Sequence, residues 1–514
     1  MTRCAIGVDI GTTSTKAVVF ASGGDGARRG AALGQHAVEY PLETPVVGAA
    51  EQDPERIFDA VIEAIGGAVA AAGIDGGIAC IAFSAAMHSV IAVDDDDRPL
   101  TQSITWADNR AAPWSRRIEA EHDGRVIYRR TGTPIHPMSP LVKLLWLRET
   151  RPDVWRAARR FVGIKEFVLR RLCGVWVVDH SIASATGLFD LASRDWDAGA
   201  LALCGLDAGR LSTLVPTTHR IALDATMASR LGVPPDTPVI VGANDGVLSN
   251  VGVGAVARGS VALTIGTSGA IRTVVDAPRT DPDGRTFCYA LTERHWVVGG
   301  PVSNGGIVLR WVRDEFAAAE TETAKRLGVD PYEVLTQIAE RVPAGSAGLL
   351  FHPYLTGERA PLWNADLRGS FFGLAIHHRK EHMIRAVLEG VLMNLLTILP
   401  AVEAVIGRTR VLKATGGFAR SAMWRQMLAD VFDRDVVVPE SIESSCFGAA
   451  MLGLLAIGEL ASLEAVDDLI GATFEHRPEP AAAATYARLA PIYTELPRLL
   501  QAQYAAIAAF QRDG

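Results

Sequence analysis

The sequence predicts an α/β protein built from two similar domains. Its 514 residues exceed the length of one ordinary domain. Strand-like runs alternate with helical patterns along the chain, which is typical of α/β units. In addition, one hydroxyl-rich hairpin pattern occurs twice, about half a chain apart, which indicates an internal repeat. With 49% hydrophobic and 21% charged residues, the composition is globular and sufficient for buried cores.

The repeated pattern is strand, tight polar turn, strand. The first copy has strands at 4–10 and 16–20 around a turn that begins at Gly11, and the second has strands at 261–265 and 270–275 around a turn that begins at Gly266. We therefore expect a domain boundary near Gly254, with an N-terminal domain over 1–254 and a C-terminal domain over 255–514. Two short hairpins can also match by chance.

Other elements follow from periodicity and capping residues. Strands are predicted at 78–83 and 239–242, and long helices at 382–399 and 481–510. Asp53 is a predicted N-cap, with Pro54 at the first helical position and apolar residues on one face of the helix that follows. The four acidic residues at 94–97 predict a solvated turn, because no further ligand follows at the spacing of a calcium loop.

Composition and charge exclude several classes of function. The formal charge of −8 favours neither nucleic acid nor an anionic membrane as a partner. The six cysteines are scattered without a C-x-x-C pair, which predicts a reduced, cytoplasmic protein. We expect no signal peptide, since 5–10 is interrupted by Asp9, and no membrane span, since apolar stretches such as 390–399 are shorter than about 20 residues.

The two hairpin turns are candidate phosphate sites. Backbone N–H groups and hydroxyls in a turn without bulky side chains suit an anion, although a plain Gly-Thr turn explains either copy alone. Asp9 is costly in an apolar strand unless it is paired or linked to a metal, and Mg²⁺ bridging to phosphate is its natural partner. The candidate residues are Gly11, Thr12, Thr13 and Ser14 in the first turn and Gly266, Thr267 and Ser268 in the second.

Two further glycine-rich loops are candidates for binding a nucleotide. Gly416 and Gly417 follow an apolar strand, where a flat ring would lie against bare backbone, although a tight turn is an equal alternative. In 299–306, Ser303 or Asn304 is predicted to cap a helix over 307–316, whose N-terminus would face a phosphate. No Walker A loop or G-x-G-x-x-G motif follows the first strand, so P-loop and dinucleotide folds are disfavoured.

Asp245 is the candidate general base. It follows a predicted strand and lies between Asn244 and Gly246, the kind of loop in which α/β folds present catalytic groups. A turn-forming aspartate or a helix N-cap is the more frequent role for such a residue.

Several stretches resemble the FGGY carbohydrate kinases, a family with the two-domain actin-like ATPase (ribonuclease H-like) fold and an interdomain active-site cleft. They are GVDIGTTSTK at 7–16, WADNR at 106–110, GERAP at 357–361, and GSFFGL at 369–374 with 382–389. The resemblance runs from Ile6 to about Gly458. Stretches at 84–89, 104–110, 131–138 and 295–300 resemble the members that act on gluconate. A signature from Met138 fits at Pro140, Lys143 and Trp146 and departs at Thr150, a position that we expect to be peripheral.

The resemblance implies a role for each matching residue. Asp9 is implied to lie near Mg²⁺, and Asp245 to be the catalytic base. The nucleotide, ATP, is implied to bind at both hairpins and at Gly416 and Gly417, and from the helix-capping argument we also expect Asn304 and Gly305 at the nucleotide. The sugar side is implied to consist of Met87, His88, Trp106, Asp108 and Arg110, and we expect His136 and the base Asp245 to contact the substrate as well. A homodimer is a further expectation from the family.

The acceptor implied by the resemblance is D-gluconate, whose carboxylate needs a cation or several donors. Arg110 and His88 are the leading candidates, followed by His136 and Lys165. Arg110 has an alternative role in bracing Asp108, and His88 as a core histidine. For His136 a turn, and for Lys165 a surface ion pair with Glu166, are the favoured interpretations.

The leading hypothesis is therefore ATP-dependent phosphorylation of gluconate, a small-molecule reaction without nucleic acid or membrane. A kinase of the same family for a neutral sugar or polyol, such as xylulose, ribulose or glycerol, is the nearest alternative, and converging cations in the sugar pocket would distinguish the two. A non-catalytic nucleotide-dependent sugar sensor or scaffold is the alternative of a different class. The presence of Asp245 with both hairpins disfavours it.

Overall fold

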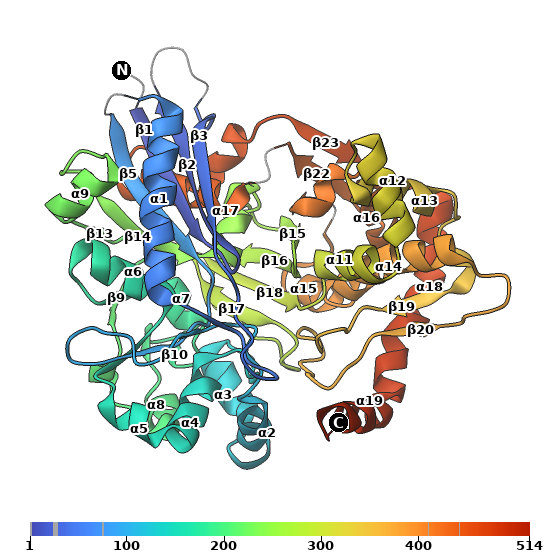
Figure 1. Ribbon diagram of the computed structural model, residues 1–514, viewed down its shortest axis with the longest axis horizontal. Coiled ribbons are helices and arrows are strands. Elements are labelled where there is room, and N and C mark those ends of the chain that lie inside the picture. The colour runs from blue at the N-terminus through green and yellow to red at the C-terminus, as the bar shows by residue number, and fades with distance from the viewer. Residues whose placement is uncertain (1–2, 24–28, 75–76, 410, 441–442, 514) are drawn as a thin grey trace. The chain divides into compact units, whose positions relative to one another are not determined.

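The computed structural model describes residues 3–23, 29–74, 77–409, 411–440 and 443–513 (Figure 1). The chain forms two compact units, each made of separate segments. The first unit contains residues 1–258, 274–298 and 443–471, and the second contains 259–273, 299–442 and 472–514. After its first segment, the chain comes back to the first unit twice, at 274–298 and at 443–471. The sequence-based division into 1–254 and 255–514 does not set these two segments apart. The domain division at Gly254 stays a prediction.

A six-stranded sheet forms the centre of the first unit. Strands β1 and β2 form the predicted antiparallel hairpin, while β1 and β5, and β5 and β14, pair in parallel. The strands, in sheet order, are β13 (Arg220–Ile221), β14 (Val239–Asn244), β5 (Ile78–Ala85), β1 (Arg3–Ile10), β2 (Ser14–Gly23) and β3 (Ala32–Glu39).

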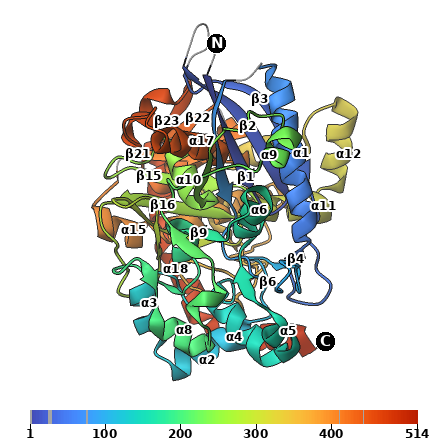
Figure 2. The same ribbon diagram turned by 90° about the vertical axis from the view of Figure 1, so that its left-hand side faces the viewer.

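Helices α1 (Pro54–Ala72) and α17 (Ser444–Ala456) cover opposite faces of this sheet (Figure 2). Alternate residues of β1 point to opposite faces, so Ile6 packs in the cluster with α1 and Ala5 in the cluster with α17. The predicted cap of α1 is confirmed, because the Asp53 carboxylate accepts from Glu55 N at 2.9 Å.

Helix α17 packs against backbone at three glycines. A Cβ atom at Gly7 would lie 1.9 Å from the carbonyl oxygen of Cys446, and one at Gly252 would lie 1.9 Å from that of Ser444. Gly448, within α17, approaches the carbonyl oxygen of Leu248 equally closely, at 2.0 Å. Only glycine permits such contact, so these three glycines determine where α17 packs within the first unit.

The rest of the first unit consists of short strands and helices, some of which enclose a third apolar cluster while others pack in the two clusters of the sheet. The turn predicted at 94–97 is confirmed, with the Asp94 carboxylate accepting from Asp96 N and Arg98 N at 2.9 Å. The helices are α2 (Ala112–Glu121), α3 (Gly124–Thr131), α4 (Pro140–Thr150), α5 (Pro152–Ala157), α6 (Ile164–Cys173), α7 (His180–Ser184), α8 (Ala198–Cys204), α9 (Ala225–Leu231) and α10 (Asp245–Gly252). The short strands are β4 (Glu51–Gln52), β6 (Ile91–Val93), β7 (Ser103–Ile104), β8 (Arg160–Val162), β9 (Val177–Asp179), β10 (Phe189–Asp190), β11 (Asp195–Trp196) and β12 (Thr213–Val215).

A seven-stranded sheet contains the second predicted hairpin, formed by the antiparallel pair β15 and β16. Strand β15 also pairs in parallel with β21, which continues in parallel to β22. The strands, in sheet order, are β17 (Phe287–Ala290), β18 (Trp296–Val302), β16 (Gly269–Val275), β15 (Val261–Ile265), β21 (Val411–Thr415), β22 (Asp435–Pro439) and β23 (Thr473–His476).

Helix α14 (Lys380–Leu396) is the central helix of the second unit. With α15 (Leu399–Ile406) it forms a stretch, 380–406, that is long and apolar enough to cross a membrane by length and composition, with a mean hydropathy of 1.6 in its most apolar window. The expectation that every apolar stretch is too short was therefore wrong. Since 61% of that window is buried and Val387, Val391 and Leu395 belong to the core cluster, the stretch is explained as a core helix pair.

The other elements of the second unit pack around this pair or extend from it. The segment predicted as one helix over 481–510 forms two, α18 (Pro480–Leu499) and α19 (Gln501–Asp513). The remaining elements are α11 (Gly306–Glu315), α12 (Ala318–Leu327), α13 (Pro331–Glu340), α16 (Ala422–Phe432), β19 (Leu350–His352) and β20 (Ser370–Phe372).

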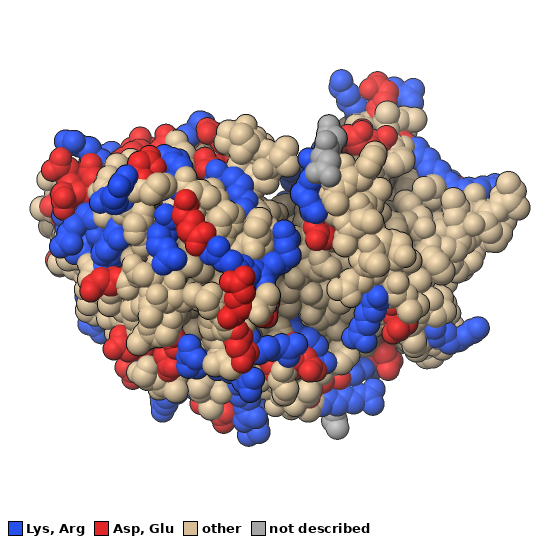
Figure 3. Space-filling view, turned by 90° about the horizontal axis from the view of Figure 1, so that it is seen from below, with Lys and Arg blue, Asp and Glu red and all other residues tan. Residues whose placement is uncertain are grey.

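The surface and the cysteines agree with the composition. On the face in Figure 3, acidic and basic side chains are interspersed. All six cysteines are free, and all but Cys173 are buried.

Candidate active site

The turn of the first hairpin is held in place by three side chains from outside the hairpin. The Tyr40 hydroxyl donates to Gly11 O at 2.7 Å, and Gln52 Nε2 donates to Thr12 O at 2.6 Å. Trp106 Nε1 donates to Thr12 Oγ1 at 2.8 Å. A hydroxyl that accepts a hydrogen bond still has a hydrogen to donate. The turn is therefore rigid, and Trp106 of the predicted sugar side meets Thr12 of the predicted phosphate side.

Asp9, at the end of β1, is beside a second carboxylate. Ser84 Oγ donates to Asp9 Oδ1 at 2.6 Å. Removal from water raises the pKa of Asp9 to about 7, and the negative charge of Asp245 adds to the rise. The two predicted acidic residues thus interact electrostatically within the first unit.

This pair of carboxylates fits Mg²⁺. A cation beside Asp9 would stabilise its ionised form and so oppose the rise in its pKa. In the described part of the chain, no group of three or more His, Cys, Asp or Glu side chains is arranged to hold a metal. Proteins commonly bind Mg²⁺ through one or two carboxylates, with water and substrate phosphates as the other ligands, so an incomplete protein shell is the expected one.

Asp245 is the first residue of α10 and does not cap it. Asn244 is the N-cap, since its side-chain oxygen accepts from Val247 N at 2.8 Å. The N-cap alternative for Asp245 was therefore wrong. The positive end of a helix dipole stabilises a carboxylate in this first turn. Lys165 Nζ donates at 3.1 Å to Ala243 O, two residues before Asp245, and so supports the end of β14.

An ion pair near Asp9 was missed by the sequence analysis. Lys16 Nζ lies 2.9 and 2.8 Å from the two carboxylate oxygens of Glu443. The charge of Lys16 favours the ionised form of Asp9, and that of Glu443 opposes it. No sequence signal links Lys16 to Glu443, because the partners are 427 positions apart.

Arg110 braces the loop that carries it. Its Nε donates to both carboxylate oxygens of Asp108, at 3.2 and 3.0 Å, and its guanidinium also contacts Glu51. The same group lies 4.6 Å from the centre of the Trp146 ring. Asp108 in turn accepts from Ala50 N at 3.0 Å. The bracing alternative is thus confirmed as a contact, and Arg110 is already flanked by two carboxylates.

The two predicted histidines both hold backbone. His88 has a φ of 72°, in the left-handed region, and its Nδ1 lies 2.7 Å from Ala185 O. His136 Nδ1 accepts from Met138 N at 3.2 Å, as a turn-shaping residue does.

A small cavity in the same unit is lined in part by Gly11, Thr12, Met87 and Trp106. The structure thus brings predicted phosphate-side and sugar-side residues together at one place.

Lys165 is not in a surface ion pair. It is 2% exposed, and its Nζ lies 2.6 Å from Asp179 Oδ2. Burial lowers the pKa of Lys165, and Asp179 opposes the fall. The surface prediction was wrong because α6 is covered on almost every side, including at Glu166 and Phe167.

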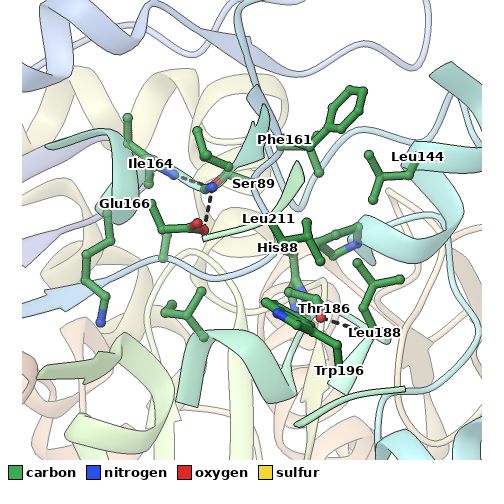
Figure 4. A pocket seen from close by; sticks show the side chains of 17 residues that line it. His88, Ser89, Leu144, Phe161, Ile164, Glu166, Thr186, Leu188, Trp196 and Leu211 are labelled. Carbon is green, nitrogen blue, oxygen red and sulfur yellow. Dashed lines mark hydrogen bonds between the residues drawn. The ribbon is translucent and has the colours of Figure 1, made fainter. Parts of the chain in front are cut away.

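A mostly apolar pocket in the first unit is lined in part by Lys165 and Glu166 (Figure 4). Glu166 lies at one end of it, near Ser89 and Ile164, and His88 and Trp196 lie at the other. The Glu166 carboxylate accepts from Gly163 N at 2.6 Å. Burial raises the pKa of Glu166 to about 7.

We expect Glu166→Gln to stabilise the protein in a pH-dependent way. A carboxyl whose pKa is raised from 4.5 to about 7 in the folded state binds more protons when folded, so stability falls as pH rises through that window. The amide keeps the acceptor for Gly163 without this cost. At pH 8 the variant should gain on the order of 3 kcal/mol, and below pH 4 it should gain nothing.

Denaturant unfolding at pH 4, 6 and 8 measures this gain. Glu149→Gln is the matched control. Its hydrogen bond from Arg117 lowers the pKa of Glu149, so that variant should lose stability, by a small amount, as pH rises. A gain in Glu166→Gln that does not change with pH would contradict the expectation.

In the second unit, the turn of the other hairpin is packed against the loop that precedes α11. Gly306 N donates to Gly266 O at 2.6 Å, and Gly305 N donates to Thr267 O at 3.2 Å. A Cβ atom at Gly305 would lie 2.3 Å from Ser268 O. The predicted phosphate residues of this unit therefore form one continuous backbone surface.

The predicted cap of the α11 helix was wrong. Gly305 is the N-cap residue, with no side-chain cap bond. Asn304 Nδ2 instead donates to Gly357 O at 2.7 Å and to Glu358 Oε2 at 3.1 Å. Glu358 also accepts from Ser303 N and Asn394 Nδ2, and so connects this loop to α14. Burial raises the pKa of Glu358.

Gly416 and Gly417 differ in the space that surrounds them. Gly416 has a φ of 114°, and a Cβ atom there would lie 2.2 Å from Ile265 O, so a tight turn accounts for this glycine. A Cβ atom at Gly417 would have nothing within 4 Å. Gly417 thus faces open space, as a residue that lies against a ligand ring would.

Comparison with protein families decides the class of the chain. The model of the FGGY family of carbohydrate kinases, N-terminal domain, matches residues 4–252, and that of the C-terminal domain matches residues 261–457. The chain belongs to the FGGY family of carbohydrate kinases. It is accordingly an ATP-dependent carbohydrate kinase. The sequence-based recognition of the family is confirmed.

Relatives of this FGGY kinase are similar over its full length. A gluconokinase of Bacillus subtilis (strain 168) is 54% identical over 100% of this chain and 99% of its own. A xylulose kinase of the same organism is 28% identical over 90% of each chain. The crystal structure of gluconate kinase from Lactobacillus acidophilus superposes with a TM-score of 0.90 at 38% identity, covering 99% of this chain and 100% of the other. The predicted actin-like ATPase fold of sugar kinases is thereby confirmed.

The one departure from the family signature is peripheral in position. Thr150 ends α4, and its Oγ1 donates to Trp146 O at 2.8 Å on the exposed surface.

Proposed function

We propose that this FGGY kinase transfers the γ-phosphoryl group of ATP to the C6 hydroxyl of D-gluconate, giving 6-phospho-D-gluconate and ADP. The observation that supports it most is the full-length similarity to a gluconokinase, which is nearly twice as high as that to the xylulose kinase of the same organism. We further expect a cytoplasmic enzyme that acts without nucleic acid or membrane, as a homodimer.

In the proposed mechanism, Asp245 is the general base. Its carboxylate orients the C6 hydroxyl and accepts its proton as the oxygen attacks the γ-phosphorus, and ADP leaves with the bridging oxygen. Such transfer depends on positioning and charge neutralisation more than on covalent catalysis. The position of Asp245 at the N-terminus of α10, beside Asp9, supports this role.

The two hairpin turns are proposed to bind the phosphates of ATP. In the first unit these are the residues from Gly11 to Ser14, and in the second those from Gly266 to Ser268 with the loop at Asn304 and Gly305. Rigid N–H and hydroxyl donors suit phosphate oxygens. Asp9 is proposed to hold Mg²⁺, which when bound neutralises phosphate charge. Gly417 and its neighbour Gly416 are proposed to lie at the adenosine.

The sugar is proposed to bind beside Met87, His88, Trp106 and Asp108, with His136 at the edge. Trp106 links this side to the phosphate side through Thr12. The hydrogen bond from Trp106 is then a direct connection between acceptor binding and the γ-phosphate.

We expect Arg110→Ala to raise the KM for gluconate at least about tenfold while the KM for ATP changes less than about twofold. The substitution leaves Asp108 and Glu51 as unpaired carboxylates near a substrate carboxylate. Steady-state kinetics with each substrate varied in turn measures both constants. An unchanged gluconate KM would remove Arg110 from the sugar side. Arg117→Ala, which breaks an exposed pair with Glu149, is the matched control and should change neither constant.

The proposed function is tested by ADP release with Mg·ATP against gluconate, xylulose, ribulose, glycerol and glucose. Preferred turnover of gluconate is expected. Preferred turnover of a neutral sugar would overturn the acceptor and keep the kinase reaction. This second candidate is favoured by one observation, a ligand-bound xylulose kinase structure from Lactobacillus acidophilus with a TM-score of 0.89 at 39% identity, covering 98% of this chain and 100% of the other. ATP binding without any turnover would favour a sensor.

A further inference from the structure

Lys143 is a fully buried lysine in the second turn of α4. Its Nζ donates to His88 O at 2.7 Å, Thr105 O at 2.7 Å and Met138 O at 2.9 Å, with a longer contact of 3.4 Å to Ile104 O. Each of these partners is a backbone carbonyl. An ammonium group with three hydrogens matches three close acceptors, which no other side chain type provides from a single atom.

The three close carbonyls come from three separate loop segments of the first unit. His88 is itself a proposed sugar-side residue, Thr105 precedes Trp106, and Met138 lies two residues after His136. Lys143 thus joins the backbones that carry three of the residues proposed to meet the acceptor. The ammonium is thus a contact shared by all three segments, in addition to the backbone hydrogen bonds between Val90 and Ile104 that join two of them.

A lysine at this position is expensive for folding. Burial lowers the pKa of Lys143 to about 7, Asp108 opposes the fall, and Arg110 adds to it. Burying an ammonium is unfavourable unless strong hydrogen bonds compensate. An apolar residue would avoid the cost of burying a charge, as Leu141, Val142 and Leu144 beside it do, but it would leave the three carbonyls without this donor. The cation therefore has a role that packing does not supply.

We propose that Lys143 is a positioning residue for the acceptor sugar, whose ammonium group fixes the loop segments carrying His88, Trp106 and His136 in one arrangement. The identity of the sugar in this inference rests on the proposed function. The contact of Lys143 with the three loop segments, which we call the clamp, does not. Lys143 touches no reacting atom in this scheme. It acts through the backbone, and through Trp106 on the Thr12 turn.

The test uses Lys143→Met, which keeps the length of the side chain and removes the hydrogen-bond donors. Amide hydrogen exchange of the full chain should increase about tenfold or more in 86–90, 103–109 and 134–139 together. The KM for gluconate should rise at least about tenfold, and the KM for ATP should change less than about twofold. Leu147→Ala is the matched control, because it removes a buried side chain from the next turn of α4 without touching these carbonyls. It should lower the melting temperature and leave both KM values and the three segments unchanged.

Each outcome bears on the proposal. Unchanged exchange in the three segments would overturn the clamp. Increased exchange with an unchanged gluconate KM would overturn the positioning role. If the wild-type protein prefers another sugar, the proposed function fails, and the KM of that sugar is measured while the exchange result still tests the clamp. Should Lys143→Met not fold, Lys143→Arg is used in both assays. Its longer guanidinium keeps the charge but displaces the three carbonyls, so the same increases are expected.

Discussion

Asp245→Asn is expected to lower kcat by a factor of about 10² to 10⁴ while ATP binding is retained. The amide cannot accept the proton of the acceptor hydroxyl, so the loss should appear in the chemical step. Because Asn244 caps α10, the substitution leaves the helix start intact, and the melting temperature should not fall. Steady-state kinetics, with calorimetry of ATP binding, measures both effects.

Asp224→Asn is the matched control for this variant. Asp224 is also an aspartate at the start of a helix in the first unit, and as the N-cap of α9 it accepts from Thr226 N at 2.9 Å. Asparagine caps equally well, so that control should keep full activity. A near-normal kcat in Asp245→Asn would remove Asp245 from the base role.

Asp9→Asn has the second largest expected effect, a fall in kcat of about 10² or more with a higher Mg²⁺ concentration needed for half-maximal rate. Stability should move the other way. The folded-state pKa of Asp9 is raised to about 7, so ionisation of Asp9 costs stability as pH rises toward 8. The amide removes that cost, and without Mg²⁺ the variant should melt at a higher temperature than wild type at pH 8, but not below about pH 4.

A Mg²⁺ titration of turnover at saturating ATP, beside melting curves at pH 4 and 8, measures these effects. Asp53→Asn, at the exposed cap of α1, is the control and should leave activity, Mg²⁺ dependence and melting temperature nearly unchanged. Loss of activity together with loss of stability in Asp9→Asn would instead make Asp9 a structural residue.

The sequence predicted those parts of the site that depend on local chemistry. Both hairpins were correctly located because a Gly-Thr turn between apolar, β-branched runs has few other solutions. The start of α1 was correct because Asp53 and Pro54 are adjacent signals that act within one turn. Strand β14 was also found from its local apolar run, whereas Asp245, expected in a loop, is the first residue of α10.

The parts of the site that the sequence could not predict depend on side-chain contacts between residues far apart in the chain. Asn304 is the right type of residue to cap α11, but Glu358, far along the chain, binds its amide instead. Lys165 is next to Glu166 in sequence, yet a side chain directed into the unit meets Asp179. Lys143 was noted only as a member of a signature, because backbone carbonyls leave no trace in the residue pattern around it.

The placement of α17 has a consequence for biosynthesis. The face of the first sheet that α17 covers is synthesised early, whereas residues 443–471, which complete that unit, are synthesised only after residues 299–442 of the second unit. Closing so long a loop is slow, and apolar surface left open invites aggregation in the meantime. The glycine contacts at Gly7 and Gly252 also admit no substitute for that segment. We therefore expect the nascent N-terminal half to stay incompletely folded until the chain has reached a helix that carries none of the proposed catalytic residues.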